Sequence, residues 1–404
     1  MNAETAPQGA PRIAAGTPEF RRTNIAVFSC GFSIFAVLYC TQPVLPLFSQ
    51  EFGVTPAQSS LALSLTTIVM AIAMIFASSI SEAVGRKPLM VFALTTSSLL
   101  TLALAFAPTW SSIVWLRALS GLALSGAPAV TLAYLGEEME KGAVASAVGI
   151  YIGGGALGGM AGRLVAAALA DYGSWRWAMA GIAITGLISA IIFWRTLPAS
   201  RHFEARPLRF AGLASSFWRH ARTPSIALLV VEGFILLGSY MNLYNYMGFR
   251  LQAAPFNLSQ AAAGLVFVVY PVGSFSSAFM GKLAGRLGRG RMLITSLLIM
   301  IAGLLIMIPD NLVCIAFGLA VMTFGFFGAH AISSGWAPAL VERDKAQASS
   351  LYLLMYYIGG GVAGSAGGVF WAQYGWLGVT MFSGAMMAAT LVVVSLLARI
   401  APVK

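Results

Sequence analysis

Charge is scarce in this 404-residue sequence. Only 9% of its residues are Asp, Glu, Lys or Arg, while 58% are hydrophobic. A soluble domain carries roughly a quarter charged residues, so this composition excludes an ordinary soluble fold. Cysteine is also rare, and Cys30, Cys40 and Cys314 show neither metal-ligand spacing nor an obvious pairing. We interpret them as small buried apolar residues and expect no metal site and no cofactor.

The apolar residues are grouped into runs long enough to cross a membrane, which takes about 20 residues in a helix. The alternating pattern of a β-barrel strand is absent. The sequence therefore predicts an all-α polytopic membrane protein. We place its twelve transmembrane helices at residues 24–48, 59–81, 89–107, 111–135, 143–164 and 177–196, then at 225–249, 261–280, 292–308, 312–339, 346–370 and 377–397.

Lys and Arg predict the orientation of the chain. All but four of the 24 lie in the termini, the central linker and alternate loops, and cytoplasmic loops carry such an excess. Both termini are therefore expected in the cytoplasm, and the net charge of +11 reflects topology rather than nucleic-acid binding. Residues 1–23 lack the apolar core of a signal peptide. We expect a disordered cytoplasmic tail there.

Two internal repeats divide the chain into pseudo-symmetric halves. The segment SEAVGRKPLM at 81–90 is echoed by AGRLGRGRML at 284–293, and YIGGG occurs at 151–155 and again at 357–361. We predict six-helix bundles at 24–197 and 225–398, a basic cytoplasmic linker at 198–224 and a short cytoplasmic tail at 399–404. Two parallel repeats imply a substrate site between the halves, near the middle of the bilayer.

The basic GRKP loop at 85–88, together with its echo in the second half, resembles the signature loop of the major facilitator superfamily. That pattern reads Gly-x-Leu-x-Asp-Arg-x-Gly-Arg-Lys, and here Ser78, Glu82 and Ala83 replace its Gly, Asp and first Arg. The resemblance implies a charge relay that ties helix ends together on the cytoplasmic side. It assigns this gating role to Glu82, Gly85, Arg86, Lys87, Arg286, Gly288 and Arg289. The alternative is that these loops are basic for topology alone.

Two more patterns resemble this superfamily. Arg117 and Gly121 match an Arg-x-x-x-Gly pattern of the fourth span, and the glycine motif of proton-coupled exporters is matched by Gly154, Gly158 and Gly159, with Gly155 where Pro is usual. Ordinary close packing of helices would also explain such glycines. The segments LYCTQPVLPLFSQEFG, VEGF and GAHAISSGW resemble the YnfM-like bacterial efflux transporters, which are grouped with drug and arabinose exporters.

Ionisable residues inside the spans are few, and each costs at least roughly 3 kcal/mol at mid-bilayer on insertion scales. Glu232 is the only acidic residue inside any span. We predict that it carries the coupled proton, because burial favours the neutral carboxyl group; the alternative is a permanent structural pair. His330 lies at a comparable depth and would bond to Glu232 or relay its proton, unless a backbone carbonyl satisfies it. Arg117 would tune the proton affinity or hold an anionic group.

The resemblance implies that the first, fourth, seventh and tenth spans line the central cavity. Aromatic and amide side chains on these spans predict the substrate cavity: Tyr39, Gln42, Asn242, Tyr244, Asn245, Phe327 and Trp336. Such walls suit a lipophilic or cationic compound, or a sugar. For Arg163 and Arg176, with Asp171 between them, we expect an ion pair at the outer gate or snorkelling to the interface.

These observations favour a monomeric secondary transporter of the bacterial inner membrane that exports a small molecule in exchange for protons. Its partners are the substrate, the proton and membrane lipid, and no nucleic acid is expected. Uptake by symport or facilitation is the alternative. A non-transporting receptor would need a soluble signalling domain, and an enzyme a polar catalytic cluster; neither is found in the sequence, which also lacks a GxxxxGKS loop.

Overall fold

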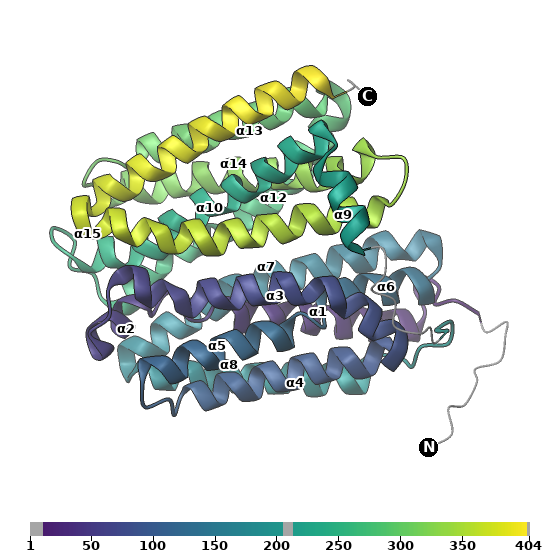
Figure 1. The fold of residues 1–404 in the computed structure, drawn as a ribbon. Helices are drawn as coiled ribbons and strands as arrows, with labels where there is room; N and C mark the ends of the chain where they lie inside the picture. Colours follow the sequence, from purple (N-terminus) through teal and green to yellow (C-terminus); the bar gives the residue numbers. More distant parts are fainter. Residues whose placement is uncertain (1–10, 205–212, 402–404) are drawn as a thin grey trace.

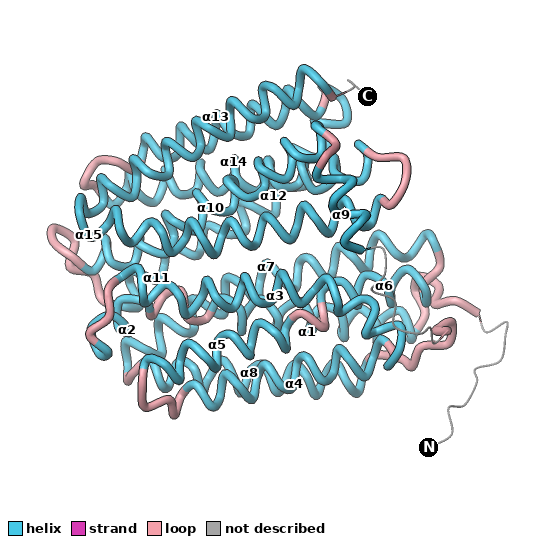
Figure 2. The backbone as a smooth tube through the Cα atoms, viewed as in Figure 1, coloured by secondary structure: helices cyan, strands magenta, loops and turns pink. Residues whose placement is uncertain are grey.

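The computed structural model describes residues 11–204 and 213–401, which fold into helices joined by short loops (Figures 1 and 2). The expectations for residues 1–10, 205–212 and 402–404 lie outside the described residues. The N-terminal half contains α1 (Pro18–Tyr39), α2 (Leu45–Phe52), α3 (Pro56–Val84), α4 (Arg86–Leu104), α5 (Trp110–Leu124), α6 (Pro128–Glu138), α7 (Lys141–Tyr172) and α8 (Trp175–Thr196).

The C-terminal half follows the linker helix α9 (Leu213–Ala221). It contains α10 (Pro224–Gln252), α11 (Gln260–Gly264), the 3₁₀ turn η1 (Leu265–Val269), α12 (Tyr270–Leu287), α13 (Arg289–Ile306), α14 (Leu312–Trp336), the 3₁₀ turn η2 (Ala337–Leu340) and α15 (Lys345–Ile400). Gly375 divides α15 with φ 58° and ψ −142°.

Twelve membrane spans result from these elements. Eleven helical segments in the described residues are long and apolar enough to cross a membrane, and the last of them is the 56-residue α15. Because the backbone at Gly375 is not helical, α15 supplies two spans rather than one. The predicted arrangement of six spans in each half is confirmed.

Local sequence signals explain where the helices begin. Thr17 and Thr55 cap α1 and α3 by accepting the backbone N–H three residues later, and each is followed by Pro. The fourth predicted span, 111–135, is in fact broken into α5 and α6. Pro128 starts α6, and its missing N–H and fixed φ do not allow an uninterrupted helix through residues 125–127.

Glycines bring the same pair of helices together in each half. A Cβ atom at Gly154 or Gly158 of α7 would overlap the backbone of Phe28 or Phe32 on α1. In the second half, a Cβ atom at Gly359 of α15 would overlap the backbone of Phe234 on α10. The repeated YIGGG segment therefore marks equivalent helix contacts in the two halves.

Both termini lie at one end of the bundle (Figure 1), which we call the terminal end; the opposite end is the far end. The prediction of a disordered tail up to residue 23 is wrong for residues 13–23. The backbone N–H of Ile13 donates to the carbonyl of Glu138 at 2.8 Å, and its carbonyl accepts from Glu140 at 3.1 Å. Within the predicted linker, α9 packs on α10 and α15, and Arg219 forms an ion pair with Asp344.

Candidate functional site

Glu232 lies in the third turn of α10 and is fully buried. Neither oxygen of its carboxyl group has a hydrogen-bond partner. The Ser333 hydroxyl of α14 lies beside the carboxyl group without completing a hydrogen bond to it. An unpartnered carboxylate is costly in such surroundings, which therefore favour the neutral form of the group.

His330 and Glu232 do not form a direct hydrogen bond. The Nδ1 atom of His330 lies 3.2 Å from the Tyr352 hydroxyl oxygen, and the Tyr352 ring packs against Gly233, the neighbour of Glu232. The His330 ring also stacks on Tyr356, with centroids 4.3 Å apart. Tyr352 therefore stands between the two groups that the sequence suggested as a pair, and the expected direct bond is not present in this state.

Arg117 is fully buried but lies in the other half. Its Nε donates to the carbonyl of Ala62 at 2.8 Å, and its two terminal nitrogens donate to the carbonyls of Val37 and Leu38 at 3.1 and 2.6 Å. These bonds tie α5 to α1 and α3. The structure thus brings Glu232 and His330 into one cluster and places Arg117 outside it.

Four of the predicted cavity residues, Tyr39, Gln42, Tyr244 and Asn245, lie at the boundary between the halves near the far end. Gln42 Nε2 donates to Asn245 Oδ1 at 2.8 Å, and Gln42 also lines a small cavity together with Tyr244. The cavity holds about 10 Å³, roughly the room that one water molecule needs. No substrate fits there while the halves are in contact.

The other three predicted cavity residues are packed within the C-terminal half. Asn242 donates to the Val379 carbonyl at 3.1 Å and to the Ser383 hydroxyl at 2.7 Å. Trp336 is buried near the start of α13. Phe327 packs edge-on against Tyr270, with centroids 5.9 Å apart.

More hydrogen bonds join the halves at the far end. Ser365 of α15 lies between Ser60 and Ser64 of α3, with hydroxyl oxygens 2.9 and 2.7 Å apart. Asp171 accepts from the Ser259 hydroxyl at 3.0 Å and from the Gln260 backbone at 3.1 Å. The far end is therefore closed in this structure.

Arg163 is neither an outer-gate partner of Asp171 nor a snorkelling residue, so both expectations for it are wrong. It is fully buried. Its Nε donates to Gln42 Oε1 at 2.6 Å and its Nη1 to the Gly159 carbonyl at 2.7 Å, while Nη2 has no partner. Arg176 instead pairs with Glu51 at 2.6 Å. The sequence did carry a signal for the burial of Arg163, because this charged residue lies inside an apolar run and follows the glycine motif.

Aromatic rings connect Arg163 with the Glu232 cluster. We call Tyr356, Phe326, Tyr240, Tyr244 and Tyr270 the aromatic column. Its successive ring centroids lie 6.4, 3.8, 4.6 and 5.9 Å apart. His330 stacks on one end of the column, and the Arg163 guanidinium lies 4.6 Å from the Tyr270 ring at the other end. The column therefore spans the distance between the two buried ionisable sites.

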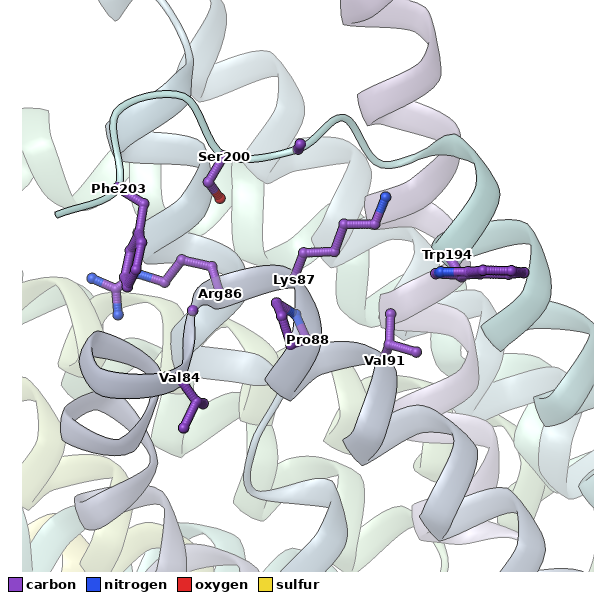
Figure 3. A pocket seen from close by; sticks show the side chains of 10 residues that line it. Val84, Arg86, Lys87, Pro88, Val91, Trp194, Ser200 and Phe203 are labelled. Carbon is purple, nitrogen blue, oxygen red and sulfur yellow. The ribbon is translucent and has the colours of Figure 1, made fainter. Parts of the chain in front are cut away.

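The predicted gating loop lies at the terminal end. Arg86 donates to both carboxylate oxygens of Glu137, at 2.7 and 3.2 Å, and Lys87 donates to the Leu197 carbonyl at 2.5 Å. Figure 3 shows both basic side chains, with Trp194, around a surface pocket of about 510 Å³. Glu82 forms no ion pair with any described residue, so the expected relay is only partly assembled in this conformation.

The second-half copy of the loop keeps the same turn geometry. Gly85 and Gly288 have φ values of 97° and 96°, in the region that favours glycine. Arg286 is exposed and Arg289 is half-buried, and neither forms an ion pair with a described residue. Across residues 11–204 and 213–401, no group of three or more His, Cys, Asp or Glu side chains is arranged to hold a metal ion.

Comparisons with known proteins agree with this architecture. The family model described as Major Facilitator Superfamily matches residues 27–256 and 233–404. The inner membrane transport protein YnfM of Escherichia coli (strain K12) is 49% identical over 94% of this chain and 91% of its own length. The uncharacterized MFS-type transporter YybF of Bacillus subtilis (strain 168) is 43% identical over 96% of each chain.

A solved structure shows the same fold at low sequence identity. A bacterial homolog of the human lysosomal transporter Spinster, in an inward-facing and occupied conformation, superposes with a TM-score of 0.74 at 16% identity, covering 95% of this chain and 96% of the other. This likeness confirms the fold. The prediction of a multi-pass membrane transporter and not an enzyme is confirmed by the family model and by the relatives named as transporters. The chain belongs to the major facilitator superfamily.

Proposed function

We propose that this transporter exports its substrate in exchange for protons, and that Glu232 binds the transported proton. The observation that carries the proposal is the complete burial of a carboxyl group whose two oxygens have no hydrogen-bond partner. A permanent structural pair would place a cation or several donors around it. Glu232 has neither among the described residues, so its environment suits reversible protonation rather than a fixed ion pair.

Alternating access supplies the route by which the proton reaches and leaves Glu232. The neutral form suits this buried and unpartnered position, and ionisation requires water to reach the carboxyl group. Movement of the halves would provide that water at a different stage of the cycle. We place the terminal end in the cytoplasm on the basis of its Lys and Arg content, and the name of the Escherichia coli relative supports an inner-membrane location.

Export rather than uptake is favoured by the glycine motif on α7. Gly154 and Gly158 hold α7 against the backbone of α1, as expected for the exporter pattern that the sequence resembles. Uptake by proton symport remains the second candidate, since Gly155 stands where the pattern has Pro. The two candidates differ in the direction of coupled movement. In export by exchange the substrate and the proton cross the membrane in opposite directions, and in symport they cross in the same direction.

The test uses inverted membrane vesicles with an acidic interior, followed by a pH-sensitive dye. Lipophilic cations, sugars and organic acids are added in turn to vesicles containing wild type, Glu232→Gln or the exposed control Glu342→Gln. We expect at least one compound to release protons from wild-type and Glu342→Gln vesicles but not from Glu232→Gln vesicles. Proton release from Glu232→Gln vesicles equal to that from wild type would overturn the role of Glu232. Movement of the substrate and protons across the membrane in the same direction would overturn export.

A further inference from the structure

Arg163 presents an unused donor at the boundary of the two halves. It lies on α7 of the N-terminal half and is fully buried. Two of its nitrogens are occupied by Gln42 and the Gly159 carbonyl, and Nη2 has no partner. None of the described carboxylates forms an ion pair with it. The positive charge is therefore stabilised by neutral groups alone.

Aromatic rings from both halves surround this charge. The guanidinium carbon lies 3.9 Å from the Tyr39 ring centroid, 4.6 Å from that of Tyr270 and 5.1 Å from that of Phe267. Tyr39 belongs to α1, whereas Phe267 and Tyr270 come from η1 and α12. Cation–π contacts of this kind offset part of the cost of burial. The contacts with Phe267 and Tyr270 are made across the boundary, so these two weaken when the halves separate.

Arg117 shows how backbone carbonyls satisfy another buried arginine of this protein. All of its bonding nitrogens donate to backbone carbonyls, on helices of a single half. Arg163 differs in two ways, because one nitrogen is left over and its neighbours belong to both halves. A buried charge without a counter-charge is expensive to keep, which indicates that its partner arrives from outside the chain.

The space beside Arg163 is divided between the halves. The small cavity near the far end is lined by Gln42 of the N-terminal half and by Tyr244 and Phe267 of the C-terminal half. Arg163 does not line the cavity itself, but Gln42 and Phe267, which do, both contact its guanidinium. Separation of the halves would therefore open the cavity toward Arg163. A carboxylate is the group that best fits a guanidinium with a free donor, because Arg binds it through parallel hydrogen bonds.

We propose that Arg163 binds the acid group of an organic anion, whose apolar body lies against the rings of Tyr39 and Tyr270. This inference rests on the proposed transport function and names its substrate class. It replaces the expectation of a cationic compound, because a buried guanidinium repels a second positive charge. It also assigns separate tasks to the two buried sites, with substrate at Arg163 and the proton at Glu232.

The test measures equilibrium binding to the purified full-length protein, without a membrane or a proton gradient. Three pairs of probes differ only in charge: benzoate and benzamide, 1-naphthoate and 1-naphthamide, and decanoate and decanamide. For at least one pair, we expect the acid to bind wild type at least tenfold more tightly than the amide. Arg163→Gln should abolish this preference, and Arg163→Lys should retain part of it. The half-buried Arg176, which is paired with Glu51, provides the matched control Arg176→Gln, which should bind like wild type.

The outcomes separate this proposal from the role of Glu232. Glu232→Gln should still prefer the acid, even if it no longer couples transport to protons. If no pair shows a preference in wild type, or if Arg163→Gln keeps it, Arg163 does not bind the substrate. Thermal unfolding of each variant checks that it is folded. If both Arg163 variants fail to fold, equal binding of acid and amide by wild type still overturns the proposal.

Discussion

Gln42 in the N-terminal half donates its side-chain amide to Oδ1 of Asn245 in the C-terminal half at 2.8 Å. The same Gln42 accepts a hydrogen bond from Arg163 through its side-chain oxygen, Oε1. One glutamine therefore connects the closure of the far end with the proposed substrate site. Binding of an anion at Arg163 would compete with Gln42 for the guanidinium, and this competition would weaken the contact that keeps the far end closed.

Replacing Asn245 with Leu should favour opening of the far end. The change removes the acceptor of Gln42, and a typical hydrogen bond contributes about 1 kcal/mol, or a factor of about five in the equilibrium between states. The measurement is the rate of disulfide formation between cysteines introduced at Ser60 and Ser365, whose hydroxyls are 2.9 Å apart. We expect the rate to fall several-fold. The exposed Gln50 on α2 provides a control, Gln50→Leu, which should leave it unchanged.

The same cysteine pair tests whether the far end must open during transport. Once oxidised, the disulfide between positions 60 and 365 fixes α3 to α15 near the far end. Substrate-induced proton release in inverted vesicles should then disappear and return on adding a reductant. The double variant kept reduced is the control. Full activity in the oxidised protein would mean that α3 and α15 stay together throughout the cycle.

Gly158 should tolerate no side chain. A Cβ atom there would lie 2.1 Å from the Phe32 carbonyl oxygen, whereas one at Gly153 on the same helix would meet no atom within 4 Å. Overpacking typically costs 1–3 kcal/mol, so we expect Gly158→Ala to lower the unfolding temperature by several degrees. Gly153→Ala is the matched control and should leave it within about a degree. Equal effects would show that α1 and α7 can move apart at no cost.

The sequence was sufficient for the fold because membrane burial acts on each helix separately. Hydropathy placed twelve spans, and the internal repeats with the basic linker between them separated the halves. The break at residues 125–127 was missed because a proline inside an apolar run does not by itself show whether the helix bends or ends. The early start of α1 was missed because Pro18 and the charged residues after it are more typical of a disordered tail than of a membrane span.

The candidate site was harder to predict because its contacts join distant parts of the chain. Glu232 was found because it is the one acidic residue inside a span. Tyr352, which stands between Glu232 and His330, comes from α15, and no local pattern connects it with them. Arg163 was assigned to the membrane interface because its depth was counted along one helix, whereas its burial is produced by rings from η1 and α12.

Glu82 and Glu137 should behave differently when neutralised. Glu137 holds the buried Arg86 in this conformation, so Glu137→Gln leaves that guanidinium poorly compensated, and we expect a lower unfolding temperature. Glu82 has no ionic partner among the described residues, so Glu82→Gln should leave the unfolding temperature nearly unchanged. If Glu82 completes the relay in the opposite conformation, as the superfamily resemblance implies, the same variant should slow transport. Normal transport by Glu82→Gln would remove it from the gate.

Electrical measurements should separate export from uptake. If one proton enters as one organic monoanion leaves, each cycle moves two positive charges inward, whereas uptake of the same anion with one proton moves none. Each charge is worth about 2.3 kcal/mol per 100 mV, so the membrane potential itself would drive export. Proteoliposomes on a solid-supported membrane, given the acid probe that binds most tightly, should show a transient current that the matching amide does not. Glu232→Gln, which would carry the anion without the proton, should give a smaller current per molecule transported. Flux of the acid in wild type without any current would contradict export of a monoanion by proton exchange and favour symport.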